Sequence, residues 1–233
     1  MKLRLLAAAL AAITLTVGAA SAQDMTSERG KLSYALGYDL GRNLAESGES
    51  IDVNTVIKAV QDGYGKKEPG VPVDQLRVAV ESMQKRQQAK MQAEFNKLAA
   101  DNKARSDAFL AQNRGKAGVR ALPSGVQYRV VETGNGAKPS QASDVQITYK
   151  GTLPDGTVLI DTNQAREGQP AGPVSMKVNQ IPLVGLREAL TQMPAGSRWE
   201  VVLPGNVAYG TDMQAGRMAN QAVVFDVKLV SVR

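Results

Sequence analysis

The stretch TYKGTLPDGTVLIDT, residues 148–162, has the pattern of a strand, a tight turn and a second strand. Its chemistry is limited, because it carries no paired carboxylates and no nucleophile beyond ordinary threonines. The whole chain of 233 residues contains no histidine and no cysteine. The usual general base, the commonest metal ligand and any thiolate are therefore missing. We expect a function that uses no metal and no cofactor.

The N-terminus has the layout of a secretory signal peptide over residues 1–22. Two basic residues precede an apolar stretch from Leu5 to Ala20, and Ala-Ser-Ala at residues 20–22 is a small-residue cleavage site. The alternative is an uncleaved anchor, but the apolar run is short for a membrane span. The sequence therefore predicts an exported chain that begins at Gln23 and works in the periplasm, with the outer surface as the alternative.

The rest of the sequence limits the kinds of partner that we expect for the mature chain. No second apolar run approaches spanning length, so we expect no membrane span in the mature chain. The formal net charge of +6 is not gathered into a basic stripe with a docking motif, which argues against nucleic acid binding. Without cysteine, the mature chain forms no disulfide and carries no lipid on a cysteine.

A helical pattern runs from residue 23 to residue 116. Leucines recur every fourth residue from Leu32 to Leu44 and predict an amphipathic helix. Asp52 is placed to cap a second helix, and Asp74 is placed to cap a third of roughly 40 residues, on the order of 60 Å long. The middle of this third helix is polar, and a disordered middle is the alternative interpretation.

The two short helices have more apolar surface than they can bury against one another. A second copy of residues 23–73 would cover this surface, so we expect a homodimer built from this helical segment. An intramolecular bundle is the alternative. Residues 74–116 are then a connecting helix between this domain and the rest of the chain.

From residue 117 to residue 233 the pattern changes to short strands between turns rich in Gly and Pro. One short amphipathic helix, LVGLREALTQM at residues 183–193, interrupts them. An antiparallel sheet wrapped over one short helix is an α+β domain. The predicted fold class is therefore α+β, with an all-helical N-terminal domain and a long connecting helix before the sheet domain.

Several motifs of this second half stand in the order found in one family. They are DVQITYKGTLPDGT, REALTQMPAGSRWEVVLP, AYG and NQAVVFDVKLV. With them the chain resembles the FKBP-type peptidyl-prolyl cis-trans isomerases. The N-terminal SYALGYDLGRNLAESGESIDVNTVIKAVQDG is similar to the helical dimerisation domain of the macrophage infectivity potentiator group of that family. The resemblance covers essentially the whole mature chain.

The resemblance implies a reaction that needs no acid, base or metal. The substrate is an X-Pro peptide bond, whose rotation barrier of about 18–20 kcal/mol arises from amide resonance. A dry apolar pocket that holds proline, with backbone hydrogen bonds that favour the twisted amide, lowers this barrier by differential binding. The implied partners are unfolded or proline-containing polypeptides, and the implied role is to assist the folding of envelope proteins.

The resemblance also implies site residues by position. Four are expected to take catalytic roles: Tyr149, Asp161, Tyr209 and Phe225. Six are expected to bind substrate: Leu159, Ile160, Ile181, Pro182, Leu183 and Leu186.

The match is imperfect at three places, one of which is Arg217-Met218-Ala219 before Asn220, where the family has the apolar flap residues IPPN. Where the family has Phe-Asp after Asp-Gly-Thr, this chain has VLID, so Leu159 or Ile160 replaces the phenylalanine and Asp161 follows a one-residue insertion. Where the family has VIPGW, this chain has IPLVGL, which puts Leu186 at the tryptophan position.

The backbone donor of the family motif is also uncertain in this chain. The Val-Ile pair, whose backbone amide binds the substrate carbonyl in the family, falls on Pro182 and Leu183. Ile181 is the alternative for the valine position. An aliphatic pocket of this kind leaves a second function open, namely a chaperone or peptide-binding module that kept the fold and lost most isomerase activity.

Overall fold

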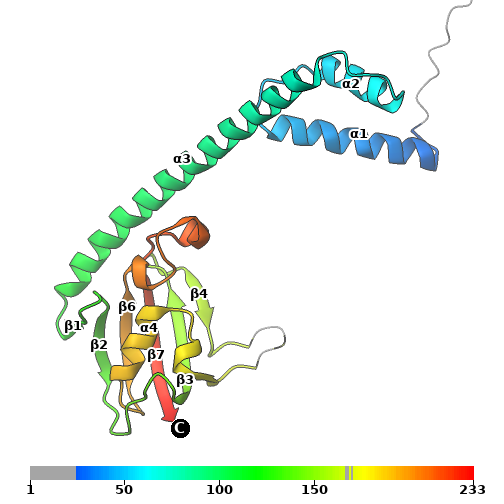
Figure 1. Cartoon of the computed structure of the whole chain (residues 1–233). Coiled ribbons are helices and arrows are strands. Elements are labelled where there is room, and N and C mark those ends of the chain that lie inside the picture. The colour runs from blue at the N-terminus through cyan, green and yellow to red at the C-terminus, as the bar shows by residue number, and fades with distance from the viewer. Residues whose placement is uncertain (1–24, 166–167, 169) are drawn as a thin grey trace, which may run out of the picture. The chain divides into compact units, whose positions relative to one another are not determined.

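The structure is a computed structural model that describes residues 25–165, 168 and 170–233 (Figure 1). The predicted signal peptide, residues 1–22, lies outside the described residues. The protein divides into two compact units, the first ending at Met83 and the second running from Gln84 to Arg233. Within the described ranges, no helix has both the length and the hydropathy that a membrane span requires.

Helices build the first unit. They are α1 (Glu28–Glu46), α2 (Val53–Tyr64) and the first part of α3 (Val73–Arg114). Ser27 caps α1 by accepting a hydrogen bond from the amide of Gly30 at 3.1 Å. Asp52 caps α2, as predicted, by accepting one from the amide of Asn54 at 3.1 Å. Both caps satisfy amides that the start of a helix leaves without a partner in the helix itself.

The apolar faces of α1 and α2 are exposed in the single chain. Leu36 on α1 is 65% exposed and Ile57 on α2 is 51% exposed. Neither helix has a buried residue among those that the structure describes. Because exposed apolar area of this extent is unfavourable in water, the first unit presents a surface that its own chain does not cover.

The helix α3 is continuous over 42 residues, which confirms the prediction of one long helix. It begins at Val73, two residues before the start that a cap at Asp74 would give, so Asp74 is not its cap. The carboxylate of Asp74 instead pairs with Arg77 at 2.9 Å, one turn further on. The polar middle is helical throughout, and the alternative of a disordered middle is not what the structure has.

The second unit is built on a seven-stranded antiparallel sheet with the order β1-β2-β6-β7-β3-β4, and β5 pairs with β3. The strands are β1 (Val119–Ala121), β2 (Gln127–Glu132), β3 (Asp144–Thr152), β4 (Val158–Asp161), β5 (Val174–Lys177), β6 (Arg198–Leu203) and β7 (Val223–Val232). The helix α4 (Val184–Gln192) lies against it (Figure 1). This is the α+β architecture that the sequence predicts.

Alternation along the central strands forms the core. Ile147 on β3, Val201 on β6 and Val227 on β7 point to one face and are fully buried. Leu186 and Leu190 of α4 belong to the same buried cluster. The amphipathic face of α4 therefore closes this side of the sheet.

The C-terminal part of α3 packs on the opposite face of the sheet at one end. Gln127 and Val202, which alternate with core residues, are each only 1% exposed. The side-chain amide of Gln127 donates to the backbone oxygen of Leu110 at 2.9 Å and accepts from Asn113 at 2.9 Å. The second half of α3 is therefore an integral part of the sheet unit.

Candidate functional site

An apolar cluster forms around a glycine in the middle of the sheet. Gly151 on β3 is paired with Phe225 on β7 and with Ile160 on β4. A Cβ atom at Gly151 would lie 2.8 Å from Cε1 of Phe225 and 3.0 Å from Cγ2 of Ile160. Tyr149, two residues earlier on β3, places its ring centroid 6.1 Å from that of Phe225 at an interplanar angle of 59°. We call Tyr149, Gly151, Ile160 and Phe225 the Gly151 cluster.

The irregular VLID segment is absorbed by a bulge in β4. Thr152 is paired with Val158 and Gly151 with Ile160, so Leu159 is the extra residue on the β4 side. Asp161 then returns to register opposite Lys150. The bulge lets Ile160, rather than Leu159, occupy the position beside Gly151.

The segment that leads into α4 offers one backbone donor. The amide of Ile181 is used, since it donates to Val178 at 3.2 Å, and Pro182 has no N–H. The backbone oxygen of Leu183 accepts from Arg187 at 3.1 Å, while no described residue accepts a hydrogen bond from the Leu183 amide. Leu186, one turn into α4, is buried at 3% exposure. Pro182 is exposed, and Leu183 packs half-buried against the core.

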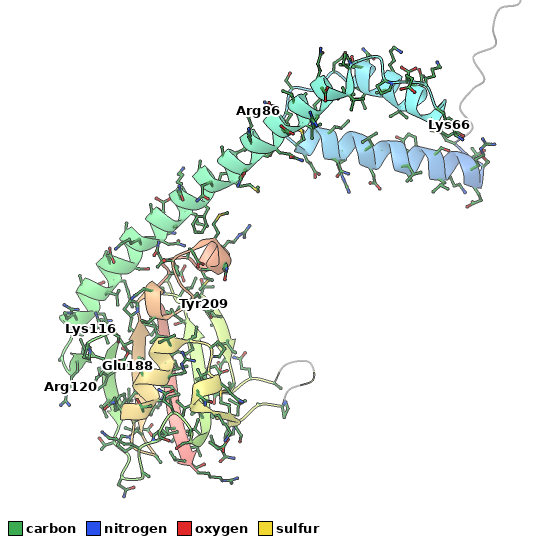
Figure 2. All side chains as sticks on the ribbon, in the orientation of Figure 1. Lys66, Arg86, Lys116, Arg120, Glu188 and Tyr209 are labelled. Carbon is green, nitrogen blue, oxygen red and sulfur yellow. The ribbon has the colours of Figure 1, made fainter. Side chains whose placement is uncertain are left out.

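Tyr209 lies at the end of the sheet unit near the short helix η3 (Met213–Met218) (Figure 2). Its side chain is 40% exposed, and its hydroxyl has no hydrogen-bond partner among the described residues. Burial raises the pKa of this tyrosine above its usual value. The loop is held by the amide of Gly210, which donates to Gly205 at 2.9 Å, and by the amide of Asn220, which donates to Gly210 at 2.9 Å.

Asp161 has a local role that its position alone did not reveal. It is 7% exposed, and its Oδ1 accepts hydrogen bonds from the backbone amide of Asn163 at 3.0 Å and from the Asn163 side chain at 3.1 Å. No hydrogen bond joins Asp161 to Tyr209 within the described part of the chain. The carboxylate therefore stabilises the turn that follows β4.

Three residues that sequence reasoning did not assign to the site lie against the same core. Val207, Ala208 and Met218 are partly buried against it. Val207 ends the short helix η2 (Gly205–Val207), and its methyl group would meet a Cβ at Gly185 at 2.9 Å. Met218 stands where the family resemblance has an apolar flap residue, and its partial burial against the core distinguishes it from the exposed Met213 of the same short helix.

A polar hollow of about 500 Å³ lies on the other side of the sheet. Its lining is Glu132, Thr148, Lys150, Asn163, Arg198, Asp226 and Lys228. Arg198 forms a two-pronged ion pair with Asp226, at 2.8 and 2.6 Å, and this carboxylate raises the pKa of the guanidinium. None of the predicted site residues lines this hollow. Since its charges largely pair with one another, it is best explained as a solvated sheet face.

The described residues contain no group of three His, Cys, Asp or Glu side chains that could hold a metal ion. The apolar Gly151 cluster, the donor at Leu183 and the half-buried hydroxyl of Tyr209 can bind and orient a peptide. They have no means to form or break a covalent bond to it.

Comparison with known families matches two models to the chain. Residues 29–130 match the domain amino-terminal to FKBP-type peptidyl-prolyl isomerase, and residues 135–230 match the FKBP-type peptidyl-prolyl cis-trans isomerase. The chain is 39% identical to the outer membrane protein MIP of Legionella longbeachae, over 100% of this chain and 99% of that relative.

The chain belongs to the FKBP-type peptidyl-prolyl cis-trans isomerases.

Two further FKBP relatives support the assignment. The FKBP-type 22 kDa peptidyl-prolyl cis-trans isomerase of Escherichia coli is 36% identical over 86% of this chain and 93% of its own length. The crystal structure of FkpA from Escherichia coli matches with a TM-score of 0.66 and 29% identity, covering 89% of this chain and 98% of that one. The predicted FKBP resemblance, the fold class and the isomerase activity of the family are thereby confirmed.

Replacing Gly151 by alanine tests whether the Gly151 cluster depends on close packing at this glycine. The added methyl group would displace the Phe225 ring, because the contact is shorter than Cβ atoms tolerate. We expect a loss of about 1–3 kcal/mol in the free energy of unfolding and a fall of about tenfold or more in kcat/KM for a proline-containing tetrapeptide. Gly70→Ala is the control, since nothing lies within 4 Å of a Cβ there. Unchanged activity in Gly151→Ala would contradict the proposed importance of the cluster.

The pH dependence of the FKBP reaction follows from the groups present. Histidine and cysteine are absent from the chain, and the pKa of Tyr209 is raised, so its hydroxyl stays protonated through neutral pH. We expect kcat/KM to be flat from about pH 6 to about pH 9. Because burial raises the pKa of Tyr209, any decline from its ionisation begins at a higher pH than for an ordinary tyrosine. A sigmoidal step near neutral pH, measured with a protease-free assay, would contradict this.

Proposed function

We propose that this chain is an exported prolyl isomerase that accelerates the folding of envelope proteins and holds the substrate proline against the Gly151 cluster. The observation that carries the proposal is the close packing of Phe225 and Ile160 over Gly151, with the Tyr149 ring beside them. A pyrrolidine ring gains free energy in such surroundings by leaving water, at about 25 cal/mol per Å² of apolar area. The location in the periplasm is part of the proposal and is supported by the signal-peptide pattern at residues 1–22.

The proposed mechanism assigns two donors to the peptide. Leu183 offers a backbone N–H that no described residue uses, and Tyr209 offers a half-buried hydroxyl. As the X-Pro bond twists, its resonance is lost and the peptide charge redistributes, so donors fixed in a dry site bind the twisted form more tightly than either planar form. Neither donor needs to change its protonation state during the reaction.

The floor of the proposed pocket is aliphatic. Leu186 takes the place where the family resemblance implies tryptophan, and it is buried at 3% exposure. Leucine excludes water but offers less area and no flat ring face to stack on proline. The difference is worth roughly 1–3 kcal/mol of binding, or tenfold or more in efficiency. We therefore propose that the rate is lower than that of relatives with an aromatic floor.

The domain organisation is proposed as follows. Residues 23–73 are the dimerisation domain, residues 74–116 are the connecting helix and residues 117–233 are the isomerase domain. The exposed apolar faces of α1 and α2 support a homodimer, because a second copy would cover them. Those same faces also favour the second candidate function, a chaperone that holds unfolded clients with little isomerase activity.

Proline-limited refolding of a model protein separates the two functions. We expect the mature chain to accelerate the slow phase catalytically, and Tyr209→Phe combined with Asp161→Ala to reduce kcat/KM about tenfold or more, since a donor and a turn anchor are both lost. Tyr64→Phe, at an 89% exposed tyrosine of the first unit, is the matched control. If no protein changes the rate while the wild type suppresses aggregation, the chaperone function replaces the isomerase function.

The homodimer is tested by charging the apolar face of α1. Leu36→Glu places a carboxylate at a leucine that is 65% exposed in the single chain, and burying it against a partner would cost several kcal/mol. We expect the wild type to have the mass of a dimer by sedimentation equilibrium and Leu36→Glu to have the mass of a monomer. Val230→Glu, at a 40% exposed valine of β7, should leave the dimer intact. A monomeric wild type would overturn the dimer.

A further inference from the structure

Two buried polar side chains on α3 have partners far away in sequence. Asn102 is 2% exposed and Ser106 is 3% exposed, one helical turn apart. Burying an amide or a hydroxyl is unfavourable unless it is fully hydrogen-bonded, and a helix that only needed to pack on a sheet could do so with apolar residues. The partners of these two side chains therefore indicate what this part of α3 does.

Asn102 donates its side-chain amide to the end of η3 and to the residue that follows it. Its Nδ2 lies 3.0 Å from the backbone oxygen of Arg217 and 3.0 Å from that of Ala219. The orientation of the amide is fixed from the other side, because Arg105 donates to its Oδ1 at 2.8 Å. Asn102 thus ties together two carbonyl groups that flank Met218.

The segment of residues 217–222 bonds back to the helix on either side of Asn102. The side chain of Asn220 donates to the backbone oxygen of Ala99 at 3.2 Å, and the amide of Ala222 donates to Ser106 Oγ at 2.8 Å. Asn220 has a φ of 59°, in the left-handed region that asparagine tolerates better than most residues other than glycine. Hydrogen-bonding groups at three positions, spread over about two turns of α3, therefore set the backbone of residues 217–222.

This segment is continuous with the site. Met218 is partly buried against the core that contains the Gly151 cluster. The amide of Asn220 donates to Gly210, the residue after Tyr209, at 2.9 Å. Gly205 packs against the backbone of Asn220 so closely that a side chain there would clash. The backbone position of residues 217–220 therefore affects both the position of Met218 and the position of the loop that carries Tyr209.

We propose that Asn102 is a positioning residue for the isomerase site: its double hydrogen bond to Arg217 and Ala219 holds Met218 and the Tyr209 loop in the arrangement that binds proline. The inference rests on the proposed function, because it takes Tyr209 as a peptide-binding residue. It adds that the connecting helix is a structural component of the site and not only a spacer between the two units.

A merely structural role is the competing explanation, and the chain offers a matched control for it. Asn113 is also a buried asparagine of α3, at 2% exposure, and also donates to the sheet unit, to Gln127 Oε1 at 2.9 Å. Its partner is on β2, in a contact that does not involve residues 217–222. A change that only loosens the helix from the sheet should act alike at Asn102 and Asn113.

The experiment compares Asn102→Asp with Asn113→Asp in the full mature chain. Aspartate keeps the shape of asparagine but loses both donors. The readouts are the melting temperature, kcat and KM for a proline-containing tetrapeptide, and the 13C methyl resonance of Met218 in methionine-labelled protein. Asn220→Gly is a second variant that removes the bond to Ala99 while accepting the positive φ, so the test survives if Asn102→Asp fails to fold.

We expect Asn102→Asp to lower kcat/KM about tenfold, mainly through KM, and to shift the Met218 methyl resonance, with Asn220→Gly changing both in the same direction. Asn113→Asp should lower the melting temperature by a similar amount and leave both site readouts close to wild type. Equal loss of activity in the two Asp variants, or an unshifted Met218 methyl in Asn102→Asp, overturns the proposal. If the wild type shows no isomerase activity, the proposed function fails, and the methyl comparison alone still decides whether Asn102 holds the segment.

Discussion

The close approach of Phe225 and Ile160 over the bare backbone of Gly151 is the contact on which the proposed site depends. Three neighbouring strands meet there, so the register of β4, β3 and β7 has to be right for the contact to exist. Because Gly151 has no side chain, the ring of Phe225 can lie across it, and Tyr149 can lie beside that ring at a tilted angle. A tightly packed apolar surface of this kind is rigid, and rigidity is what allows a site without acid, base or metal to favour one shape of a peptide bond over another.

The helix α3 contacts the sheet unit through buried hydrogen bonds, in contrast to the apolar packing around Gly151. Its middle is polar, and the side-chain hydrogen bonds that join its C-terminal part to the sheet unit involve Asn102, Ser106 and Asn113, the last of which donates to Gln127 of β2. Apolar contacts tolerate sliding, whereas buried hydrogen bonds with two donors and two acceptors fix one register because any slip leaves groups unpaired. The use of polar residues therefore fits a helix that has to present the segment 217–222 in a single arrangement.

The sequence was informative where a pattern repeats and uninformative where one residue decides. The leucine spacing of α1, the cap at Asp52 and the strand alternation each repeat a physical rule, and they predicted the elements. The VLID segment left two choices, since nothing in the residue types says whether Leu159 or Ile160 enters the bulge, and only the pairing with Gly151 decides it. Asn102 could not be identified at all, because a polar residue in a polar helix looks like any solvated position. Its 117-residue separation from Ala219 is a property of the tertiary structure alone.

Two departures from the family pattern concern the proposed pocket: Leu186 at the tryptophan position and Pro182 in the loop before α4. In the proposed pocket, Leu186 in place of the tryptophan that the family resemblance implies would reduce the contact area with proline, while Leu186 itself belongs to the buried cluster on α4. Pro182 has no N–H to donate, yet no described residue accepts a hydrogen bond from the amide of Leu183, while the amide of Ile181 donates to Val178. Under the proposed mechanism, both changes would alter the strength of binding and leave its geometry in place. In a reaction governed by differential binding, geometry sets which state of the peptide is favoured and contact area sets by how much. A chain that keeps the binding geometry and has a smaller contact area should remain an isomerase. Its rate should be slower, and the nature of the catalysed step should not change.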